Sequence, residues 1–295
     1  NEKGVPVKVI KKERGDSNKL IEEFMLLANR KVAEVIARNI EKNKGTDKEG
    51  TFIYRVHDFP SKEKMEELAH FLKGLGYTLP MKDGVIPSQA INNLLETIAK
   101  HDANHGIEGT VHRAVIRSMA KAVYSTRNIG HYGLAFEYYT HFTSPIRRYP
   151  DIVVHRLLAE YLENKSGKKH NLGQEFNEYQ KIALVSSEQE KRASDAERAS
   201  IKYKQVEYMS KRIGEKFEGI ISGVTEWGLY VEEIGTKCEG FVRVRDMNDD
   251  FYKFDDKKLE LVGEKKKKRY RMGDKINIKV VSADLERKMI DYALI

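Results

Sequence analysis

The chain has a single cysteine, Cys238, among its 295 residues, and this scarcity excludes several kinds of site. One thiol can neither form a disulfide within the chain nor supply a cysteine-based zinc site. Chains without structural disulfides are typical of reducing compartments. We therefore expect a cytoplasmic protein with no disulfide partner.

Long apolar runs are also missing. No run approaches the roughly 18 residues that a membrane-spanning helix needs, so we expect no membrane partner. Residues 1–12 are polar and basic without an apolar centre, which argues against a secretory signal. The chain begins with Asn1 instead of methionine, so we expect a fragment or a processed product.

Prolines are few, 6 in all, and no low-complexity repeat occurs. The chain is 40% hydrophobic and 33% charged, a composition typical of a globular protein with one large domain or two ordinary ones. Its formal net charge of +8 favours a polyanionic partner but does not identify it.

Apolar residues recur at helical spacing through the first two thirds of the chain. We expect helices at residues 17–42, 61–74, 88–100 and 111–124, a short strand at residues 52–56, and a strand with a loop at residues 130–143. Ser144 and Pro145 predict a further helix that bends at Pro150. Residues 174–213 contain neither glycine nor proline, which predicts one long helix.

Beyond Gly214 the apolar period falls to two, which predicts strands. We expect five of them, at residues 217–224, 229–233, 239–244, 275–283 and 288–294. Five short strands in this space favour a small closed barrel of the OB-fold type, which commonly binds oligonucleotides. The predicted fold class is therefore α+β, with a mostly helical domain at residues 1–213 followed by an all-β, five-stranded OB-fold barrel at residues 214–295.

One segment carries most of the chain's resemblance to a known family: His141-Phe142-Thr143-Ser144-Pro145-Ile146-Arg147-Arg148-Tyr149-Pro150-Asp151, which continues to His155-Arg156-Leu157-Leu158. It closely resembles the SPIRRYPD-type motif of the RNase II/RNase R (RNB) family of exoribonucleases. Further segments agree in the same order, at residues 21–29, 54–58, 117–124, 131–135, 196–198, 217–219 and 227–230. The resemblance spans essentially the whole chain, and the RNase R versions of these segments are closer than those of RNase II.

The resemblance implies the end of an RNB catalytic domain followed by an S-one-type OB-fold. Members of the family hydrolyse RNA processively from the 3′ end and release 5′-mononucleotides, with a divalent metal such as magnesium assisting the attack. The implied partners are single-stranded RNA and structured RNA with a 3′ overhang, with ribosomes as a further candidate.

The resemblance also assigns roles within the motif. Arg147 matches the family arginine that contacts the scissile phosphate, and a guanidinium suits bidentate contact with phosphate oxygens. Without the motif, an ordinary surface arginine would be the simpler interpretation. For Arg148 we expect a structural role or a contact with the RNA backbone.

Two carboxylates match family positions near the RNA. Glu22 corresponds to a glutamate that holds the 3′-terminal ribose, where it can accept a hydrogen bond from the 2′-hydroxyl; the alternative is a helix-start residue that complements the helix dipole. Glu197 corresponds to a carboxylate that lines the catalytic pocket; the alternative is an exposed partner of nearby lysines. The chain departs from the family at Ala199, where an aspartate is usual.

In the barrel, the resemblance assigns RNA contact to an aromatic face and a basic turn. Aromatic faces stack bases with little sequence preference, and lysines neutralise the backbone. The alternatives are that Tyr230 packs inside the barrel and that the basic run is a solvated hairpin. The expected RNA-binding residues are Trp227, Tyr230, Arg243, Lys265, Lys266, Lys267, Lys268 and Arg269.

Metal sites are not expected in this chain. His101 and His105 have the i,i+4 spacing of zinc ligands, but the residues around them predict a loop. The acidic run from Asp246 to Asp256 is better interpreted as a surface loop than as a magnesium site. The family's metal-binding aspartates belong to an upstream segment, so the parent protein is expected to be an exoribonuclease and this chain to be inactive alone.

Two other functions remain open. The chain could be a non-catalytic module that holds single-stranded RNA, or a helical scaffold whose barrel contacts proteins. Clustered aspartates upstream would favour the enzyme, and RNA affinity that falls steeply with salt would exclude the scaffold.

Overall fold

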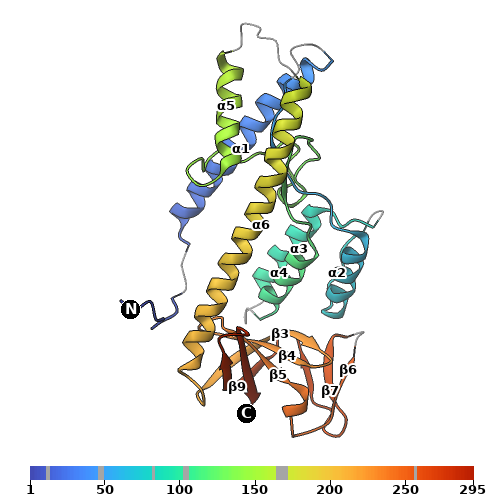
Figure 1. Ribbon diagram of the computed structural model, residues 1–295. Coiled ribbons are helices and arrows are strands. Elements are labelled where there is room, and N and C mark those ends of the chain that lie inside the picture. The colour runs from blue at the N-terminus through green and yellow to red at the C-terminus, as the bar shows by residue number, and fades with distance from the viewer. Residues whose placement is uncertain (11–13, 46–49, 82–83, 102–105, 164–171, 256–257) are drawn as a thin grey trace. The chain divides into compact units, whose positions relative to one another are not determined.

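The computed structural model describes residues 1–10, 14–45, 50–81, 84–101, 106–163, 172–255 and 258–295. The chain folds into two compact units: a motif unit of residues 13–62 and 119–194, and a barrel unit of residues 1–12, 63–118 and 195–295. The predicted long helix is confirmed as α6 (Leu172–Ser210), which contributes residues to both units (Figure 1). None of the described helices is long and apolar enough to cross a membrane.

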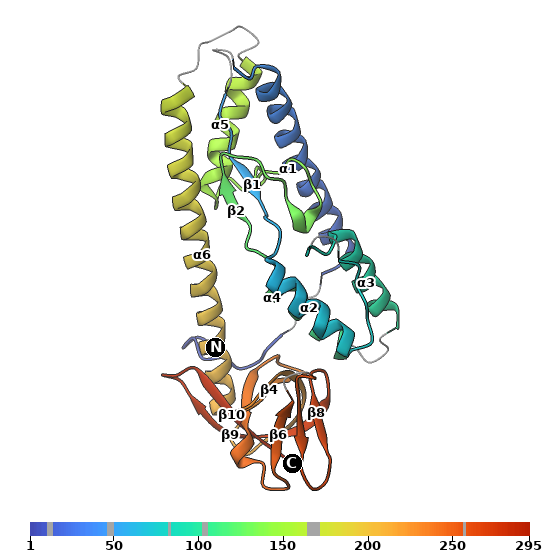
Figure 2. The ribbon, with the colours of Figure 1, turned by 90° about the vertical axis from the view of Figure 1, so that its right-hand side faces the viewer.

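The motif unit is built around a pair of short strands. β1 (Tyr54–Val56) and β2 (Val123–Ser125) are antiparallel, with Arg55 opposite Tyr124 (Figure 2). The helices α1 (Asp16–Lys42) and α5 (Tyr149–Glu163) belong to the same unit, together with the first part of α6 and the short helix η1 (Tyr132–Leu134). Their apolar faces meet in one core, whose members include Ala33, Ile36, Phe52, Ile53, Val154 and Ala183.

Two helix predictions in this part of the chain are wrong at one end. The helix expected to run to Tyr124 corresponds to α4 (Gly106–Ser118). It ends at Ser118, and Val123 and Tyr124 pair with β1. The helix expected from Ser144 begins at Tyr149, and residues 145–147 form a turn. Pro150 thus occupies the first turn of α5, where its missing N–H costs no hydrogen bond, and it does not bend the helix.

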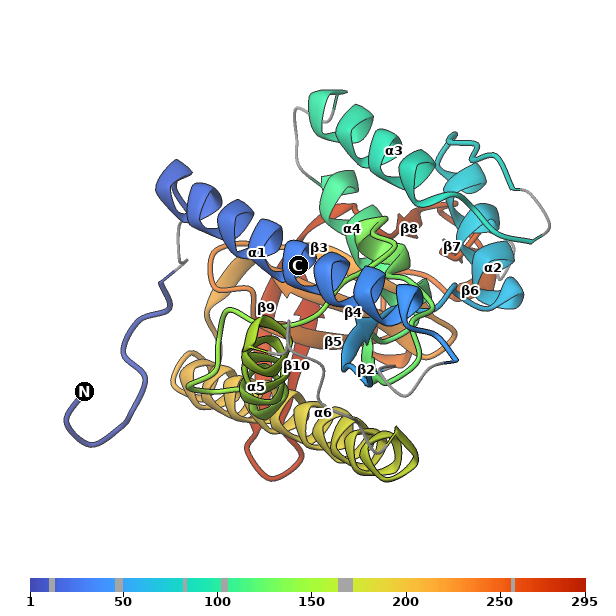
Figure 3. The same ribbon diagram turned by 90° about the horizontal axis from the view of Figure 1, so that it is seen from above.

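The barrel unit contains three amphipathic helices and the barrel. α2 (Lys62–Gly74) and α3 (Ser88–His101) confirm their predictions, and α3 lies against α4 (Figure 3). α2 buries Met65, Leu68 and Leu72, which are spaced three and four residues apart on one face.

The predicted five-stranded barrel is confirmed. Its strands are β3 (Lys216–Thr225), β4 (Gly228–Glu233), β5 (Glu239–Arg243), β9 (Lys275–Asp284) and β10 (Met289–Leu294). They close in the order β10-β5-β4-β3-β9, and β10 runs parallel to β5 while the other neighbours are antiparallel. Val206 and Met209 of α6 are fully buried in the barrel's core.

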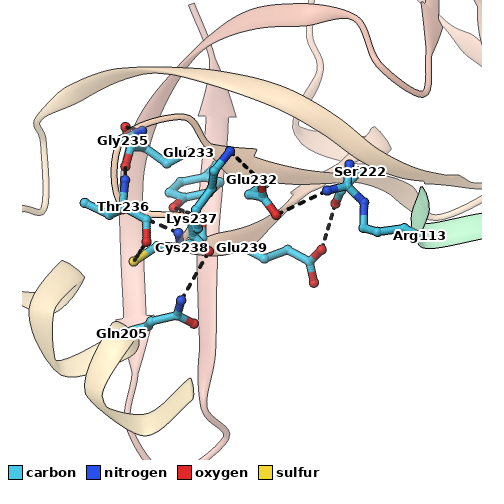
Figure 4. Close-up of polar contacts among 11 residues, drawn as sticks. Arg113, Gln205, Ser222, Glu232, Glu233, Gly235, Thr236, Lys237, Cys238 and Glu239 are labelled. Atoms are coloured by element: carbon cyan, nitrogen blue, oxygen red, sulfur yellow. Dashed lines mark hydrogen bonds and ion pairs between the residues drawn. The ribbon is translucent and has the colours of Figure 1, made fainter. Parts of the chain in front are cut away.

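The last turns of α6 are fastened to the turn between β4 and β5 (Figure 4). The buried carboxylate of Glu233 accepts hydrogen bonds from the backbone N–H groups of Gly235 and Thr236, which fixes the shape of this turn. Gln205 Nε2 then donates to the carbonyl oxygen of Lys237 at 3.2 Å. The end of the long helix and the barrel therefore form one body.

A second, three-stranded sheet was missed by the sequence reasoning. β6 (Tyr252–Asp255), β7 (Glu260–Gly263) and β8 (Arg269–Arg271) are antiparallel neighbours in the order β6-β7-β8. They bury Tyr252, Leu261 and Tyr270 in the barrel's core. β6 occupies part of the stretch that was expected to be an acidic surface loop, and the basic run lies at the turn between β7 and β8, as a hairpin would.

The start of β4 requires a glycine. Gly228 has a φ of 153°, and a Cβ there would lie 2.0 Å from the carbonyl oxygen of Val242. We expect Gly228→Ala to lower the free energy of unfolding by about 3 kcal/mol, because the strands must separate to admit the methyl group. Thermal unfolding followed by circular dichroism measures the effect.

Gly74→Ala is the matched control, since a Cβ at Gly74 has no atom within 4 Å. It lies at the end of a helix, so the change is expected to be neutral or slightly stabilising. Equal stability of the two variants would mean that β4 and β5 do not approach closely at Gly228.

Candidate functional site

The motif loop, residues 144–148, is a tight turn that leads into α5. The N–H groups of Arg147 and Arg148 both donate to the carbonyl oxygen of Ser144, at 3.2 and 3.1 Å. The side chain of Arg147 points outward and is exposed; its Nη2 reaches Ser144 Oγ at 3.5 Å. The sequence predicted a helix here. The structure has a turn, which presents Arg147 just before the first residue of α5, where a ligand can approach it.

Arg148 lies the other way. Its side chain is 18% exposed, and its Nη2 donates to Asp151 Oδ2 at 2.8 Å. Asp151 is fully buried in the first turn of α5, and the same oxygen accepts the N–H of Ser144 at 2.7 Å. Of the two roles expected for Arg148, this geometry favours the structural one.

A polar cluster of the motif unit surrounds Tyr124. The hydroxyl of Tyr124 lies 2.8 Å from His141 Nδ1, and the guanidinium of Arg55 lies 4.7 Å from the centre of its ring. Arg55 also forms an ion pair with Glu190 of α6. Glu190 was missed by the sequence reasoning; the available signal was its position two helical turns before Glu197 on the same uninterrupted helix.

Two buried histidines of the motif unit, His131 and His141, are held neutral. Burial, reinforced by the positive charges of Arg148 and Arg55, lowers the pKa of His141 to about 2. Burial together with the neighbouring His57 lowers the pKa of His131 to about 4. These two imidazoles therefore add no positive charge near neutral pH.

Glu22 lies on α1, exposed, with its carboxylate 3.9 Å from Arg14. It precedes the buried Asn29 by seven residues, so the two side chains share one face of the helix to within about 20°. Asn29 Oδ1 accepts the N–H groups of Phe142 and Thr143, directly before the motif loop. The face of α1 that carries Glu22 is thus the face that contacts this segment.

Glu197 is exposed on α6, in the part of the helix that belongs to the barrel unit. Arg147 belongs to the motif unit, so the two predicted catalytic residues lie in different units. Glu197 and Glu190 share one face of α6, again because they are seven residues apart.

The barrel presents an aromatic face on β4 and β5. Trp227, in the turn before β4, is 72% exposed. The exposed Tyr230 pairs across the strands with Phe241, with ring centres 4.9 Å apart, so it does not pack inside the barrel. Gly223 lies opposite Tyr230, and a Cβ there would come within 3.3 Å of its ring. Phe241 was missed, although the alternation along residues 239–243 places it on the same face as Arg243.

Arg243 is held beside this face. Its Nη2 lies 3.1 Å from both carboxylate oxygens of Asp291, and Ser282 Oγ donates to the same carboxylate. β4 pairs Gly228 with Arg243, which puts the guanidinium near the turn that carries Trp227. The Asp291 contact fixes the side chain but also offsets part of its charge.

The basic turn at residues 264–268 is shaped by an aspartate. Asp250 accepts the N–H groups of Lys265 and Lys266, and the four lysines from 265 to 268 are exposed. Arg269 differs, since its Nη1 lies 2.9 Å from the buried Glu260. Lys266 is partly offset as well, because its Nζ lies 3.8 Å from Asp249. The charge of this turn therefore rests mainly on Lys265, Lys267 and Lys268.

No group of three or more potential metal-ligating side chains occurs among the described residues. Asp249 and Asp250 of the acidic run bond to Tyr252 and to the basic turn respectively. Of the two histidines with zinc-like spacing, His105 lies outside the described residues, as does Asp256. The described side chains thus offer a cation, Arg147, for a phosphate but no ligand cluster for magnesium.

Comparison with known proteins agrees with this geometry. The RNB domain family matches residues 1–164, and the S1 RNA binding domain family matches residues 210–294. Ribonuclease R of Thermotoga maritima is 39% identical over 297 residues, covering 100% of this chain and 40% of that protein. Ribonuclease R of Aquifex aeolicus is 37% identical, covering 100% of this chain and 39% of that protein.

A solved structure shows the same fold. Mycoplasma genitalium RNase R in complex with ribose methylated single-stranded RNA superimposes with a TM-score of 0.86 at 29% identity, over 100% of this chain and 44% of that one. The chain thus spans about two fifths of the length of the relatives that it matches. With the RNB domain matching more than half of its residues and ribonuclease R proteins matching all of it, the chain belongs to the RNB family, on the ribonuclease R branch.

Proposed function

We propose that this chain is the carboxy-terminal part of a processive 3′-to-5′ hydrolytic exoribonuclease that releases 5′-mononucleotides. The observation that carries the proposal is the opposite orientation of two neighbouring arginines. Arg147 is exposed at the tip of the motif loop, while Arg148 is fixed inward by the buried Asp151. A loop built this way presents one guanidinium to a ligand and uses the other to hold its own shape.

Arg147 acts on the scissile phosphate. Attack on phosphorus increases the negative charge on the phosphate oxygens, and a guanidinium can donate two parallel hydrogen bonds to them. Arg55 and Arg148 add positive charge in the same unit, and the neutral His141 accepts or donates a hydrogen bond without changing that charge.

A divalent metal belongs to the chemistry of the RNB family, where it activates water and offsets charge on the phosphate. Because the described residues hold no ligand cluster, they do not fit such a metal by themselves. Magnesium would be held by residues outside this chain, and the chain's own part is to bind and orient the RNA.

The two carboxylates bind the end of the strand. Glu22 accepts a hydrogen bond from the 2′-hydroxyl of the 3′-terminal ribose, which distinguishes RNA from DNA. Its place on the face of α1 that contacts the segment before the motif loop supports this role. Glu197 lines the catalytic pocket from the face of α6 that also carries Glu190, the ion-pair partner of Arg55.

The barrel binds single-stranded RNA. Trp227, Tyr230 and Phe241 offer stacking surfaces on one face, Arg243 lies beside them, and the lysine turn contacts the RNA backbone.

We also propose that the two domains divide between residues 213 and 214 and that the protein is cytoplasmic. The proposed substrate is RNA with a 3′ overhang, with ribosomes as a further partner. The RNA in the Mycoplasma genitalium complex supports an RNA substrate.

A non-catalytic RNA-binding module is the second candidate. The observation that favours it is the lack of a metal-ligand cluster among the described residues, beside a barrel whose aromatic and basic side chains are exposed. The two candidates differ in whether the longer polypeptide hydrolyses RNA.

The 295-residue chain alone is expected to release no mononucleotides from single-stranded RNA in the presence of magnesium. The reason is that the part of the chain that the structure describes holds no cluster of metal ligands, and without a bound metal the attacking water is not activated. Thin-layer chromatography of labelled RNA after incubation measures the products. Progressive, magnesium-dependent shortening from the 3′ end by a pure preparation would overturn this prediction.

In the full-length exoribonuclease that carries this chain, Arg147→Ala is expected to lower turnover by about 100-fold with little change in RNA affinity. The contact strengthens as charge develops in the transition state, so its loss appears in the rate constant. Single-turnover cleavage and equilibrium binding separate the two effects. Arg38→Ala, an exposed arginine on α1, is the control and should behave as the parent. If the variant lost RNA affinity but cleaved bound RNA at the normal rate, Arg147 would only hold the RNA, and its proposed role at the scissile phosphate would be wrong.

The 295-residue chain is expected to bind single-stranded RNA weakly and without marked sequence preference. Replacing Lys265 to Lys268 by glutamine should reduce the slope of log affinity against log salt, by about 0.7 for each lost phosphate contact. Trp227→Ala should weaken binding at every salt concentration and leave the slope unchanged, because stacking releases no counterions.

Fluorescence anisotropy of labelled RNA at several salt concentrations measures both quantities. Phe251→Ala is the matched control for Trp227→Ala, because Phe251 is also an exposed aromatic residue but lies outside the β4–β5 face. A chain with no RNA affinity at low salt would refute the RNA-binding role of the barrel.

A further inference from the structure

Both ends of the motif loop bond to one oxygen of one buried side chain. Asp151 Oδ2 accepts the N–H of Ser144 at 2.7 Å and the Nη2 of Arg148 at 2.8 Å. Arg147 lies between these two residues, and its own N–H returns to the carbonyl oxygen of Ser144 at 3.2 Å. The carboxylate therefore closes the loop from which Arg147 projects.

A second buried side chain fixes the approach to the loop. Asn29 of α1 is 4% exposed, and its Oδ1 accepts the N–H groups of Phe142 and Thr143 at 2.9 and 3.2 Å. Its Nδ2 donates to the hydroxyl of Tyr139 at 3.1 Å. The backbone on the amino-terminal side of the loop is thus tied to α1, while the loop itself is tied to α5.

The Asp151–Arg148 pair is not arranged for greatest stability. Among the described residues, Asp151 Oδ1 and Arg148 Nε are buried without a hydrogen-bond partner. A buried ion pair with unsatisfied atoms carries a desolvation cost, and well-packed apolar residues of similar volume are often as stable. The contribution of this pair is therefore better sought in the position that it gives the motif loop than in the free energy of folding.

We propose that Asp151 is a positioning residue for Arg147, with Asn29 holding the preceding backbone. The inference rests on the proposed function, in which Arg147 contacts the phosphate, and it adds residues that touch neither RNA nor metal. A displacement of about 1 Å at a catalytic group can cost about 100-fold in rate. Loosening the loop should therefore slow the chemical step without weakening the grip on RNA.

Asp151→Asn in the full-length exoribonuclease tests the proposal. The amide oxygen is a weaker acceptor for the N–H of Ser144 than the carboxylate, and the charge that holds Arg148 is gone. We expect kcat to fall by about 10- to 100-fold and KM to stay within about 2-fold. The thermal midpoint should also fall, because the largely buried Arg148 loses its counter-charge. Asp195→Asn is the matched control: Asp195 is an exposed carboxylate, paired with Arg198 at 2.9 Å, and its loss should alter neither constant. Normal turnover by Asp151→Asn would overturn the proposal.

A double substitution separates positioning from a general structural role. If Asp151 acts through Arg147, the variant with both Arg147→Ala and Asp151→Asn should be no slower than Arg147→Ala alone. Losses that multiply would overturn the proposal. If Asp151→Asn folds poorly, Arg148→Lys replaces it, because it keeps the charge pair and alters its geometry; the same lack of additivity is expected.

Hydrogen exchange on the 295-residue chain gives a readout that needs no catalysis. Asp151→Asn should speed exchange of the amides of Ser144 and Arg147 by at least about 10-fold and leave the amides of β1 and β2 unchanged. Unchanged exchange in the loop would overturn the proposal. An inactive full-length enzyme would refute the proposed function separately, since the exchange result does not depend on it.

Discussion

The shape of the motif loop depends on one carboxylate, Asp151, and on the hydrogen bonds that it accepts. It lies fully buried at the start of α5, where the helix dipole favours a negative charge. It accepts two bonds, from the N–H of Ser144 and from Arg148, and so spans the turn that precedes α5. The exposure of Arg147 is a consequence of this arrangement, because a helix continued to Ser144 would place that side chain elsewhere.

The long helix α6 packs residues into both hydrophobic cores, because no glycine or proline interrupts it between residues 174 and 213. Residues 174–213 contain no glycine or proline, so nothing in the chain interrupts the helix. Ala183 packs in the core of the motif unit, while Val206 and Met209 pack in the core of the barrel. Gln205 and Lys202 add hydrogen bonds to backbone carbonyls of the turn after β4 and of β5. One secondary-structure element thus supplies residues to both units, and it also carries Glu190 and Glu197.

Local pattern predicted the regular parts of this fold and failed where distant contacts decide. The barrel strands follow from alternating apolar residues, and all five lie where that alternation places them. β6, β7 and β8 have three or four residues each and are rich in charge, so alternation could not reveal them. Ser144 and Pro145 carry the usual signal of a helix start, but Asp151 and Asn29 hold that backbone in another form. The contact from Asn29 to Phe142 joins residues 113 positions apart, and no local period encodes it.

The candidate site could be predicted from the sequence only through its motif. The structure adds which side chains of the motif are exposed and which are buried. In the sequence Arg147 and Arg148 are simply two neighbouring basic residues. In the structure the side chain of Arg147 is exposed, whereas that of Arg148 is largely buried and paired with Asp151. The same burial holds the pKa of His141 near 2, so that imidazole cannot gain a proton at neutral pH. Positive charge beside His141 therefore comes from guanidinium groups such as Arg148 and not from this imidazole. Burial likewise lowers the pKa of His131 to about 4, so neither of these two imidazoles adds a pH-dependent charge between about pH 5 and 9.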